Sequence, residues 1–227
     1  MRTSSVMKCC SNCAHYNEGT SDRMQAPSSF RLVKVAEADL PSEYGPFRIY
    51  GFEGLFAGRK EEAVALKLGD LTGAPPLVRV HSQCLTGDVF HSLRCDCRAQ
   101  LDLALRMIAE EGRGLLIYEN QEGRGIGLLN KLRAYELQDA GADTVEANEL
   151  LGFEADLRSF ELPGAILKYF GLTEIRLLSN NPDKVESVER AGVKVVERVP
   201  CIADLVASRE GYLATKRDKL GHLFEGG

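Results

Sequence analysis

The chain has 227 residues, which fits one large domain or two small ones, and 44% of them are apolar, enough to build a sizeable core. The formal net charge of -5 argues against a protein that binds nucleic acid or an anionic membrane, so an anion site would need a local cluster of cations and backbone N–H groups. No apolar run approaches the roughly 20 residues of a membrane-spanning helix, and the first residues lack a secretory signal. We therefore expect a cytoplasmic protein.

Residues 1–29 are polar and lack apolar periodicity, so we expect a mobile arm ahead of a domain formed by residues 30–227. The arm contains Cys9, Cys10, Cys13 and His15. Cys10 and Cys13 have the spacing of half a zinc knuckle, but a second pair is missing. Incidental thiols in a disordered tail are the alternative.

Residues 30–83 are predicted to form strands. Apolar and polar residues alternate in Phe47–Phe52 and again in Ala63–Leu68, as expected for half-buried strands. Gly54 and Gly58 are interpreted as turn signals between them.

Pro75-Pro76 leads into a further strand, Leu77–His81, which we assign to the same antiparallel β layer. Arg79 and His81 are two residues apart and so share one side of this strand. The layer would deliver both side chains to the segment that follows.

From residue 98 onwards, helical periodicity alternates with short apolar runs, which predicts α/β architecture. The expected elements are a helix ended by Gly112, a strand at Gly114–Tyr118, a helix at about Leu128–Ala140, a helix at about Pro163–Phe170, a strand at Ile175–Leu178, a helix begun by Asn181-Pro182 and a strand at Val193–Val199. Residues 175–199 have about the length of a parallel crossover. The predicted fold is mixed α/β, with an N-terminal antiparallel β layer followed by alternating units on a mostly parallel sheet.

Three of the seven cysteines lie close together, at Cys84, Cys95 and Cys97. Disulfides are unusual in a reducing compartment, so metal binding or catalysis is the better interpretation of clustered thiols. Three thiolates can hold zinc and leave its fourth position for water, as in a catalytic site. His81 and His91 are nearby candidates for a fourth ligand, so a closed structural site remains an alternative at this point.

A glycine-rich segment, Gln121–Gly127, follows a predicted strand and precedes a predicted helix. Backbone N–H groups in that context can cradle phosphate, and Arg124 could add a bidentate contact. Glu122 could hold Mg²⁺ or a base amino group. The segment lacks the Walker and dinucleotide-binding spacings, so an ordinary connecting loop is the alternative.

Two further segments carry paired functional groups. Asp156 and Arg158 are two residues apart and could face one site, although a surface ion pair is the commoner reason for such a pair. Ser179–Lys184 leaves a strand end and enters a helix N-terminus, a common place for ligand contact in α/β sheets. For Lys184 alone, a solvated surface lysine is the commoner interpretation.

Taken together, these motifs resemble GTP cyclohydrolase II, the first enzyme of riboflavin biosynthesis, from about residue 30 to 224. The segments that carry the resemblance are Arg79–Asp88, Ser92–Cys97, Gln121–Lys131, Asp143–Asn148 and Leu177–Pro182. We expect the stand-alone form of that enzyme, because 227 residues are too few to add the dihydroxybutanone phosphate synthase domain often fused to it.

The resemblance implies a reaction in which GTP loses pyrophosphate and C8 of guanine leaves as formate. The product would be 2,5-diamino-6-ribosylamino-4(3H)-pyrimidinone 5′-phosphate. Cys84, Cys95 and Cys97 match the ligands of one catalytic zinc per chain, whose water would attack C8. Asp156 matches the proposed proton acceptor. Arg158 matches a proposed nucleophile for the guanylyl group, although a cation that only stabilises the phosphorane charge is an equal alternative.

The resemblance also implies a set of GTP contacts, with Mg²⁺ on the triphosphate and a homodimeric enzyme. The matching positions are Arg79, Val80, His81, Ser82, Gln83, Gln100, Glu122, Gly123, Arg124, Thr144, Ser179 and Lys184, with Tyr135 near the reacting base. Gln83 stands where many members have Glu, which makes that contact neutral. Ser179 replaces a frequent Thr and keeps the hydroxyl.

Three other functions compete with this one. A related enzyme could stop at the formamidopyrimidine nucleotide, although the presence of Tyr135 favours the full reaction. A zinc-stabilised nucleotide-binding module without catalysis should instead show four protein ligands. A nucleobase deaminase is disfavoured, because its His-x-Glu and Pro-Cys-x-x-Cys pattern is missing.

Overall fold

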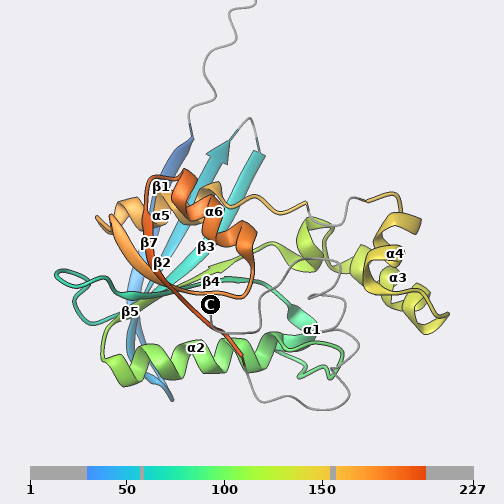
Figure 1. Ribbon diagram of the computed structural model, residues 1–227, viewed down its shortest axis with the longest axis horizontal. Coiled ribbons are helices and arrows are strands. Elements are labelled where there is room, and N and C mark those ends of the chain that lie inside the picture. The colour runs from blue at the N-terminus through green and yellow to red at the C-terminus, as the bar shows by residue number, and fades with distance from the viewer. Residues whose placement is uncertain (1–29, 57–58, 154–156, 203–227) are drawn as a thin grey trace, which may run out of the picture.

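A computed structural model describes residues 30–56, 59–153 and 157–202 (Figure 1). Asp156, the predicted arm of residues 1–29 and its cysteines lie outside the described residues. The strands are β1 (Arg31–Ser42), β2 (Gly45–Phe56), β3 (Arg59–Leu68), β4 (Leu77–Ser82), β5 (Gly114–Glu119), β6 (Glu174–Leu178) and β7 (Lys194–Val199). The helices are α1 (Leu85–Asp88), α2 (Cys97–Glu111), the 3₁₀ turn η1 (Glu122–Gly125), α3 (Leu128–Asp139), α4 (Thr144–Leu150), α5 (Glu161–Tyr169) and α6 (Pro182–Arg190).

The strands form one seven-stranded sheet in the order β1-β2-β3-β5-β4-β6-β7. The pairs from β1 to β5 are antiparallel, and the pairs from β5 to β7 are parallel. Helix α2 covers one face of the sheet, and α5 with α6 covers the other (Figure 1). The mixed α/β fold predicted from the sequence is therefore confirmed.

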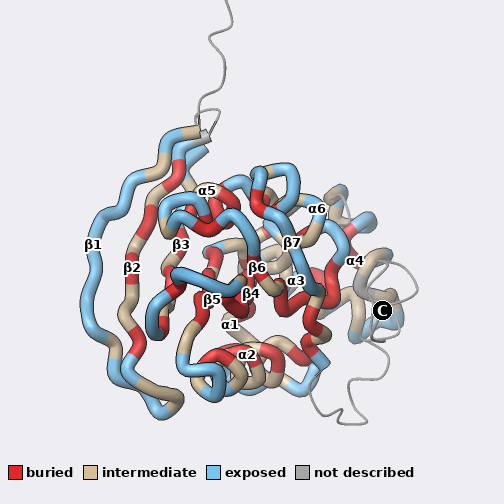
Figure 2. The backbone as a smooth tube through the Cα atoms, turned by 60° about the vertical axis from the view of Figure 1, so that its left-hand side comes forward, coloured by how far each residue is buried: buried red, intermediate tan, exposed pale blue. Residues whose placement is uncertain are grey.

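Each face of the sheet has its own hydrophobic core. Beneath α5 and α6, Ala63 and Ala65 of β3 pack with Leu162 and Ile166. On the α2 side, Leu68 joins a second cluster that includes Ala104 and Ile108 of α2. Successive side chains of β3 are therefore buried on opposite faces of the sheet, because helices cover both faces. Figure 2 shows the central strands buried and the edge strand β1 mostly exposed.

Strand β4 corrects one prediction. It was assigned to the antiparallel layer, but it pairs in parallel with both β5 and β6. The chain returns from β4 to β5 through α1 and α2, and such a crossover makes neighbouring strands parallel. Arg79 and His81 therefore arrive from the parallel half of the sheet, at its carboxyl edge.

Most predicted elements are confirmed within a few residues, including the parallel β6–α6–β7 crossover and the Asn181 N-cap of α6. Gly54 is not a turn but lies inside β2, where the side chains of Phe30 and Leu162 pack over it. An ideal Cβ at Gly54 would come within 2.8 Å of Phe30, which explains a glycine in mid-strand. Gly58 lies outside the described residues.

Helices α3 and α4 extend beyond the carboxyl edge of the parallel strands and pack on one another (Figure 1). Helix α4 was not predicted from the sequence. In the described part of the chain, no helix is both long enough and apolar enough to cross a membrane.

Candidate active site

One cavity opens at the carboxyl ends of β4, β5 and β6, where ligands commonly bind in parallel sheets. It contains most of the site residues predicted from the sequence, brought together by strand β4 and by several loops and helices that are far apart in the chain. Those that line it are Arg79, His81, Ser82, Gln83, Cys84, Cys95, Cys97, Gln100, Glu122, Gly123, Arg124, Tyr135, Arg158, Ser179 and Lys184.

The three thiols meet at one side of this cavity. The ligand atoms of Cys84, Cys95 and Cys97 all lie within 4.8 Å of one another, and the Cys84 and Cys95 Sγ atoms are 3.7 Å apart. Tetrahedral zinc with Zn–S bonds of about 2.3 Å separates its sulfurs by about 3.8 Å, so the thiols fit that metal. An ideal Cβ at Gly87 would stand 2.7 Å from Cys95 Sγ, and only glycine leaves room for the thiols to converge.

Charges around the thiols favour thiolate. Hydrogen bonds from the Cys95 and Cys97 thiols, with the ammonium of Lys131, hold the pKa of Cys84 well below its usual range. Lys131 Nζ lies 3.1 Å from Cys84 Sγ and 2.7 Å from Glu122 Oε1. Burial opposes the charge on Lys131, but the Cys84 thiolate and the Glu122 carboxylate outweigh it and raise its pKa.

Neither candidate histidine joins the thiols in the described residues. His81 Nε2 lies 3.2 Å from both carboxylate oxygens of Asp88, which also accepts from Tyr118 Oη at 2.8 Å. His91 is exposed. Within the described ranges, the group that could hold a metal thus comprises three protein ligands, which suits an open rather than a closed zinc site.

Three buried nitrogens in the cavity have no hydrogen-bond partner among the described residues: Arg79 Nε, His81 Nδ1 and Arg124 Nη1. Burial lowers the pKa of His81, so the ring is neutral, and its Nε2–H donates to Asp88. Its Nδ1 is then an acceptor, while the two arginines offer donors. An unpaired buried polar atom is costly, so these atoms suit a ligand that carries both anionic and donor groups.

The glycine-rich segment forms η1 and contains two consecutive left-handed residues, Gly123 (φ 63°) and Arg124 (φ 59°). A non-glycine residue in this region is uncommon and is frequently found at functional sites. Arg124 O accepts from Leu157 N at 3.0 Å, and Gly125 packs so closely on Leu157 that a Cβ would meet its backbone at 3.0 Å. This contact sets the segment that carries Arg158 against η1.

The carboxylate of Glu122 already accepts hydrogen bonds from other groups of the protein. It accepts from Leu85 N at 2.6 Å and from Gly123 N at 3.0 Å, in addition to Lys131. It therefore ties η1 to α1 and α3, a role that the sequence did not indicate.

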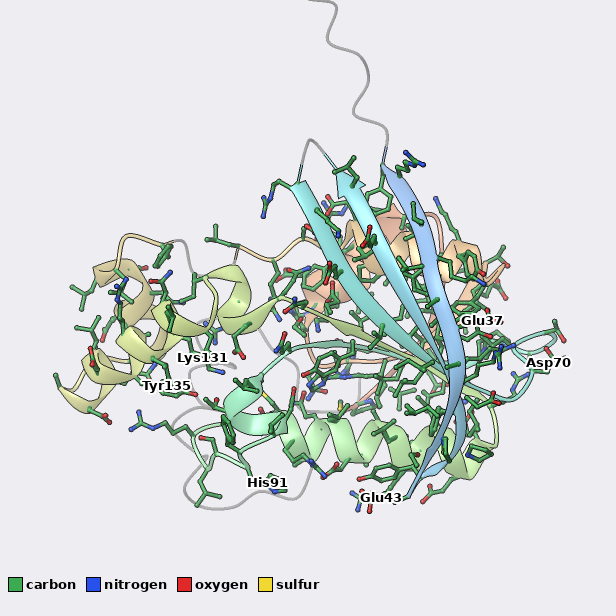
Figure 3. All side chains as sticks on the ribbon, turned by 180° about the vertical axis from the view of Figure 1, so that it is seen from behind. Glu37, Glu43, Asp70, His91, Lys131 and Tyr135 are labelled. Carbon is green, nitrogen blue, oxygen red and sulfur yellow. The ribbon has the colours of Figure 1, made fainter. Side chains whose placement is uncertain are left out.

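Helix α3 contributes one face to the cavity. Lys131, Tyr135 and Gln138 follow one another at helical spacing and line it together with Ala134. Figure 3 shows Lys131 and Tyr135 on α3, and Tyr135 Oη meets Thr86 Oγ1 of α1 at 3.1 Å. Burial raises the pKa of Tyr135, so its phenol keeps its proton at neutral pH. Lys131 is a site residue missed from the sequence, although its position one turn before Tyr135 was an available signal.

The remaining predicted residues are placed as follows. Val80 packs in the core and presents only its carbonyl, which accepts from Lys184 Nζ at 2.8 Å. Gln100 Oε1 accepts from Arg79 Nη2 at 2.7 Å. Ser179 Oγ accepts from Asn181 N at 3.1 Å. Thr144 begins α4, and its side chain is outside the description.

A three-thiol group beside a cavity rich in cations, at the carboxyl edge of a mixed sheet, defines an α/β protein with a candidate metal centre and an anion site. A family model described as GTP cyclohydrolase II matches residues 33–200. The chain belongs to the GTP cyclohydrolase II family.

Individual relatives agree with this assignment. GTP cyclohydrolase-2 of Escherichia coli O9:H4 (strain HS) and that of strain K12 / DH10B are each 57% identical to it over 194 residues, 85% of this chain and 98% of theirs. A solved two-domain 3,4-dihydroxy-2-butanone 4-phosphate synthase from A. baumannii aligns with a TM-score of 0.42 and 17% identity, over 79% of this chain and 42% of that chain. That likeness is below the level that establishes a common fold.

Proposed function

We propose that this protein hydrolyses GTP to formate, pyrophosphate and 2,5-diamino-6-ribosylamino-4(3H)-pyrimidinone 5′-phosphate, the first step of riboflavin biosynthesis. One observation carries the proposal beyond family membership: the unpartnered nitrogens of Arg79, His81 and Arg124 line the same cavity as the three thiols. A nucleotide offers phosphate oxygens to the arginines and a base or ribose donor to His81 Nδ1.

Cys84, Cys95 and Cys97 would hold one zinc ion per chain. When bound there, zinc supplies a Lewis acid that lowers the pKa of water to about 7. Lys131 balances the negative charge of the thiolates, and Tyr135 offers a protonated phenol near the base. Asp156 would accept the proton.

At the phosphate end, Arg124, Arg158 and Lys184 supply positive charge. Arg158 remains protonated at neutral pH and already donates to Ser82 Oγ at 3.4 Å. A hydrogen-bonded guanidinium is suited to stabilising the charge of the reacting phosphorus, and we prefer that role to covalent attack. Mg²⁺ would bind the triphosphate oxygens, because Glu122 is occupied by protein donors.

The partial reaction, which keeps C8 as a formamide, is the nearest alternative. The Tyr135–Thr86 contact brings a phenol close to Cys84, since Thr86 Oγ1 is 3.7 Å from Cys84 Sγ. Because both reactions open the ring at C8 beside the metal, this contact does not separate them, and the presence of Tyr135 is the feature that favours the full reaction.

The test is product analysis with zinc-loaded protein, GTP and Mg²⁺. We expect formate and pyrophosphate in equal amounts, together with a diaminopyrimidine chromophore. Pyrophosphate without formate would identify the partial enzyme, and the absence of both products would refute the proposal. Cys84→Ser should lose zinc, whereas Cys201→Ser, which changes a buried thiol outside the three-thiol group, should retain it.

We also propose the location, the oligomeric state and the domain bounds of the enzyme. We expect a cytoplasmic homodimer whose catalytic domain is residues 30–227. We expect no nucleic acid or membrane partner, in keeping with the net charge of -5.

A further inference from the structure

Glu119 ends β5 directly beneath the cavity. Its side chain is fully buried, yet it is not among the residues that line the cavity. The carboxylate accepts from Gln121 Nε2 at 3.1 Å and from Ser82 Oγ at 3.3 Å. No ion pair at contact distance joins this carboxylate to another of the described residues, and a buried carboxylate in that state is unusual.

The hydroxyl of Ser82 links this carboxylate to the cations of the cavity. Arg158 Nη1 lies 3.4 Å from Ser82 Oγ, and Lys184 Nζ lies 3.3 Å from it. A hydroxyl has two lone pairs and one proton, so two cationic donors use both lone pairs. The proton of Ser82 must then point to an acceptor, and Glu119 is that acceptor.

The hydrogen-bond count determines which form of Glu119 fits. An ionised carboxylate accepts both the Ser82 proton and the Gln121 amide, whereas a proton on the oxygen that faces Ser82 would add a third donor to a hydroxyl oxygen that already accepts two. The described arrangement therefore fits the ionised form of Glu119 best, because a carboxylic acid could accept the Ser82 proton only through its carbonyl oxygen. Burial raises the pKa of Glu119 to about 7, against the opposing effects of Lys184, Arg158 and Ser82, and Glu61 on β3 raises it further.

We propose that Glu119 is a positioning residue, whose carboxylate orients Ser82 and through it holds Arg158 and Lys184 where the triphosphate of the substrate meets them. This inference rests on the proposed function, because it assumes that Arg158 and Lys184 act on GTP. Glu119 does not itself line the cavity, so it acts through other side chains.

The change in nucleotide affinity when Glu119 is neutralised distinguishes a positioning role from a merely structural one. A negative charge beneath the cavity repels an anionic nucleotide, so its removal should not weaken ground-state binding. Loss of the orientation of Arg158 should, however, slow the chemical step, because misplacement of a reacting group by about 1 Å can cost about a hundredfold in rate. A damaged site would instead lose binding and rate together.

The central variant is Glu119→Gln, which is nearly isosteric and neutral. We expect kcat to fall by about tenfold to a hundredfold. The Kd of a GTP analogue with a methylene bridge between the α- and β-phosphorus atoms, measured by calorimetry, should be unchanged or lower. Glu119→Asp keeps the charge and should recover part of the lost kcat. Glu62→Gln, an exposed carboxylate on β3, is the matched control and should behave as wild type.

Two further measurements test the link through Ser82. The effects of Glu119→Gln and Ser82→Ala on kcat should be far from additive, because both break the same link. The acid limb of kcat/KM reports groups of the free enzyme, and ionisation of Glu119 should contribute to it in the wild type. In Glu119→Gln this limb should move to lower pH.

The inference is overturned if kcat of Glu119→Gln stays within about twofold of wild type with an unmoved acid limb. It is equally overturned if the analogue Kd rises in proportion to the fall in kcat, since that is the behaviour of a distorted site. Failure of the wild-type enzyme to release both pyrophosphate and formate from GTP would refute the proposed function itself, and the inference with it.

Discussion

Gly87 shows how one residue can decide whether a metal centre forms. Its backbone lies so close to the thiols that a Cβ would sit 2.7 Å from Cys95 Sγ and 3.1 Å from Cys84 Sγ. The sequence analysis singled out the cysteines, whose spacing is visible, but not this glycine. Its importance depends on a close approach in space that no spacing reveals.

We predict that Gly87→Ala weakens zinc binding. Forcing a methyl group into a packed site costs about 1–3 kcal/mol, which corresponds to about tenfold or more in affinity if it falls on the bound state. Zinc per chain, measured by atomic absorption after dialysis against graded chelator, should fall at lower chelator concentrations than in wild type. Gly51→Ala is the control, because its Cβ would meet nothing closer than 4.0 Å. Equal zinc retention in Gly87→Ala and wild type would contradict the prediction.

At the scale of elements, helix α4 is stabilised more by the cap at its N-terminus than by packing against the core. Asp143 caps it by accepting from Val145 N and Glu146 N, and the Glu146 carboxylate in turn accepts from Asp143 N, which completes a capping box. Its main neighbour among the described elements is α3. A short helix of this kind opens locally when its cap is lost.

Asp143→Ala should therefore cost about 1 kcal/mol in the opening of α4, because it removes the side chain that caps the first turn of that helix. Hydrogen exchange should show its amides exchanging about fivefold faster, with the amides of β4 and β5 unchanged. Glu149→Ala, on an exposed position of the same helix, controls for loss of a carboxylate. Faster exchange throughout the sheet would show that α4 is coupled to the core instead.

The contrast between α4 and the sheet explains what the sequence could predict. The central strands and α2 have long apolar patterns, so periodicity located them. With seven residues, α4 has less than two full turns, too few for periodicity, although Asp143 and Glu146 had the spacing of a capping box. The direction of β4 depends on which strands pair, which is a property of tertiary structure.

The candidate site was predictable to a similar extent. Thiols, arginines and the glycine-rich segment carry chemistry that can be recognised from residue type and spacing. Lys131, Asp88 and Glu119 act through contacts with other residues, so their roles emerge only when β4, β5 and α3 are brought together.

For the whole molecule, we predict a homodimer that involves the loop between α1 and α2. Val89, Phe90 and Leu93 are 57%, 70% and 58% exposed, an unusual grouping for a loop in contact with water. Light scattering should give about twice the chain mass of 24.9 kDa for the wild type. Phe90→Asp should shift it towards one chain mass, because a charge in an apolar contact is costly.

Val35→Asp, on the exposed edge strand β1, is the matched control and should leave the dimer intact. A monomeric wild type would contradict the prediction, and so would dissociation caused by Val35→Asp, which would implicate the sheet edge.

The buried carboxylate of Glu119 also has a consequence for the thermodynamics of folding. Its pKa of about 7 lies above the ordinary value of 4.5, so the folded chain binds a proton that the unfolded chain releases. The contribution of this group to stability is complete below about pH 4.5, and it is lost as the pH rises through about 7. Ionised Glu119 then costs about 3 kcal/mol of folding free energy.

Glu119→Gln should remove this penalty. In urea titrations it should gain stability relative to wild type on going from pH 5 to pH 8, while Glu62→Gln should not. If the difference in unfolding free energy between Glu119→Gln and wild type is the same at pH 5 and pH 8, ionised Glu119 does not destabilise the fold. If this difference is larger at pH 8, the protein is less stable in the pH range where the ionised carboxylate is needed. Conformational stability is then lower than it could be because the site requires a buried charge.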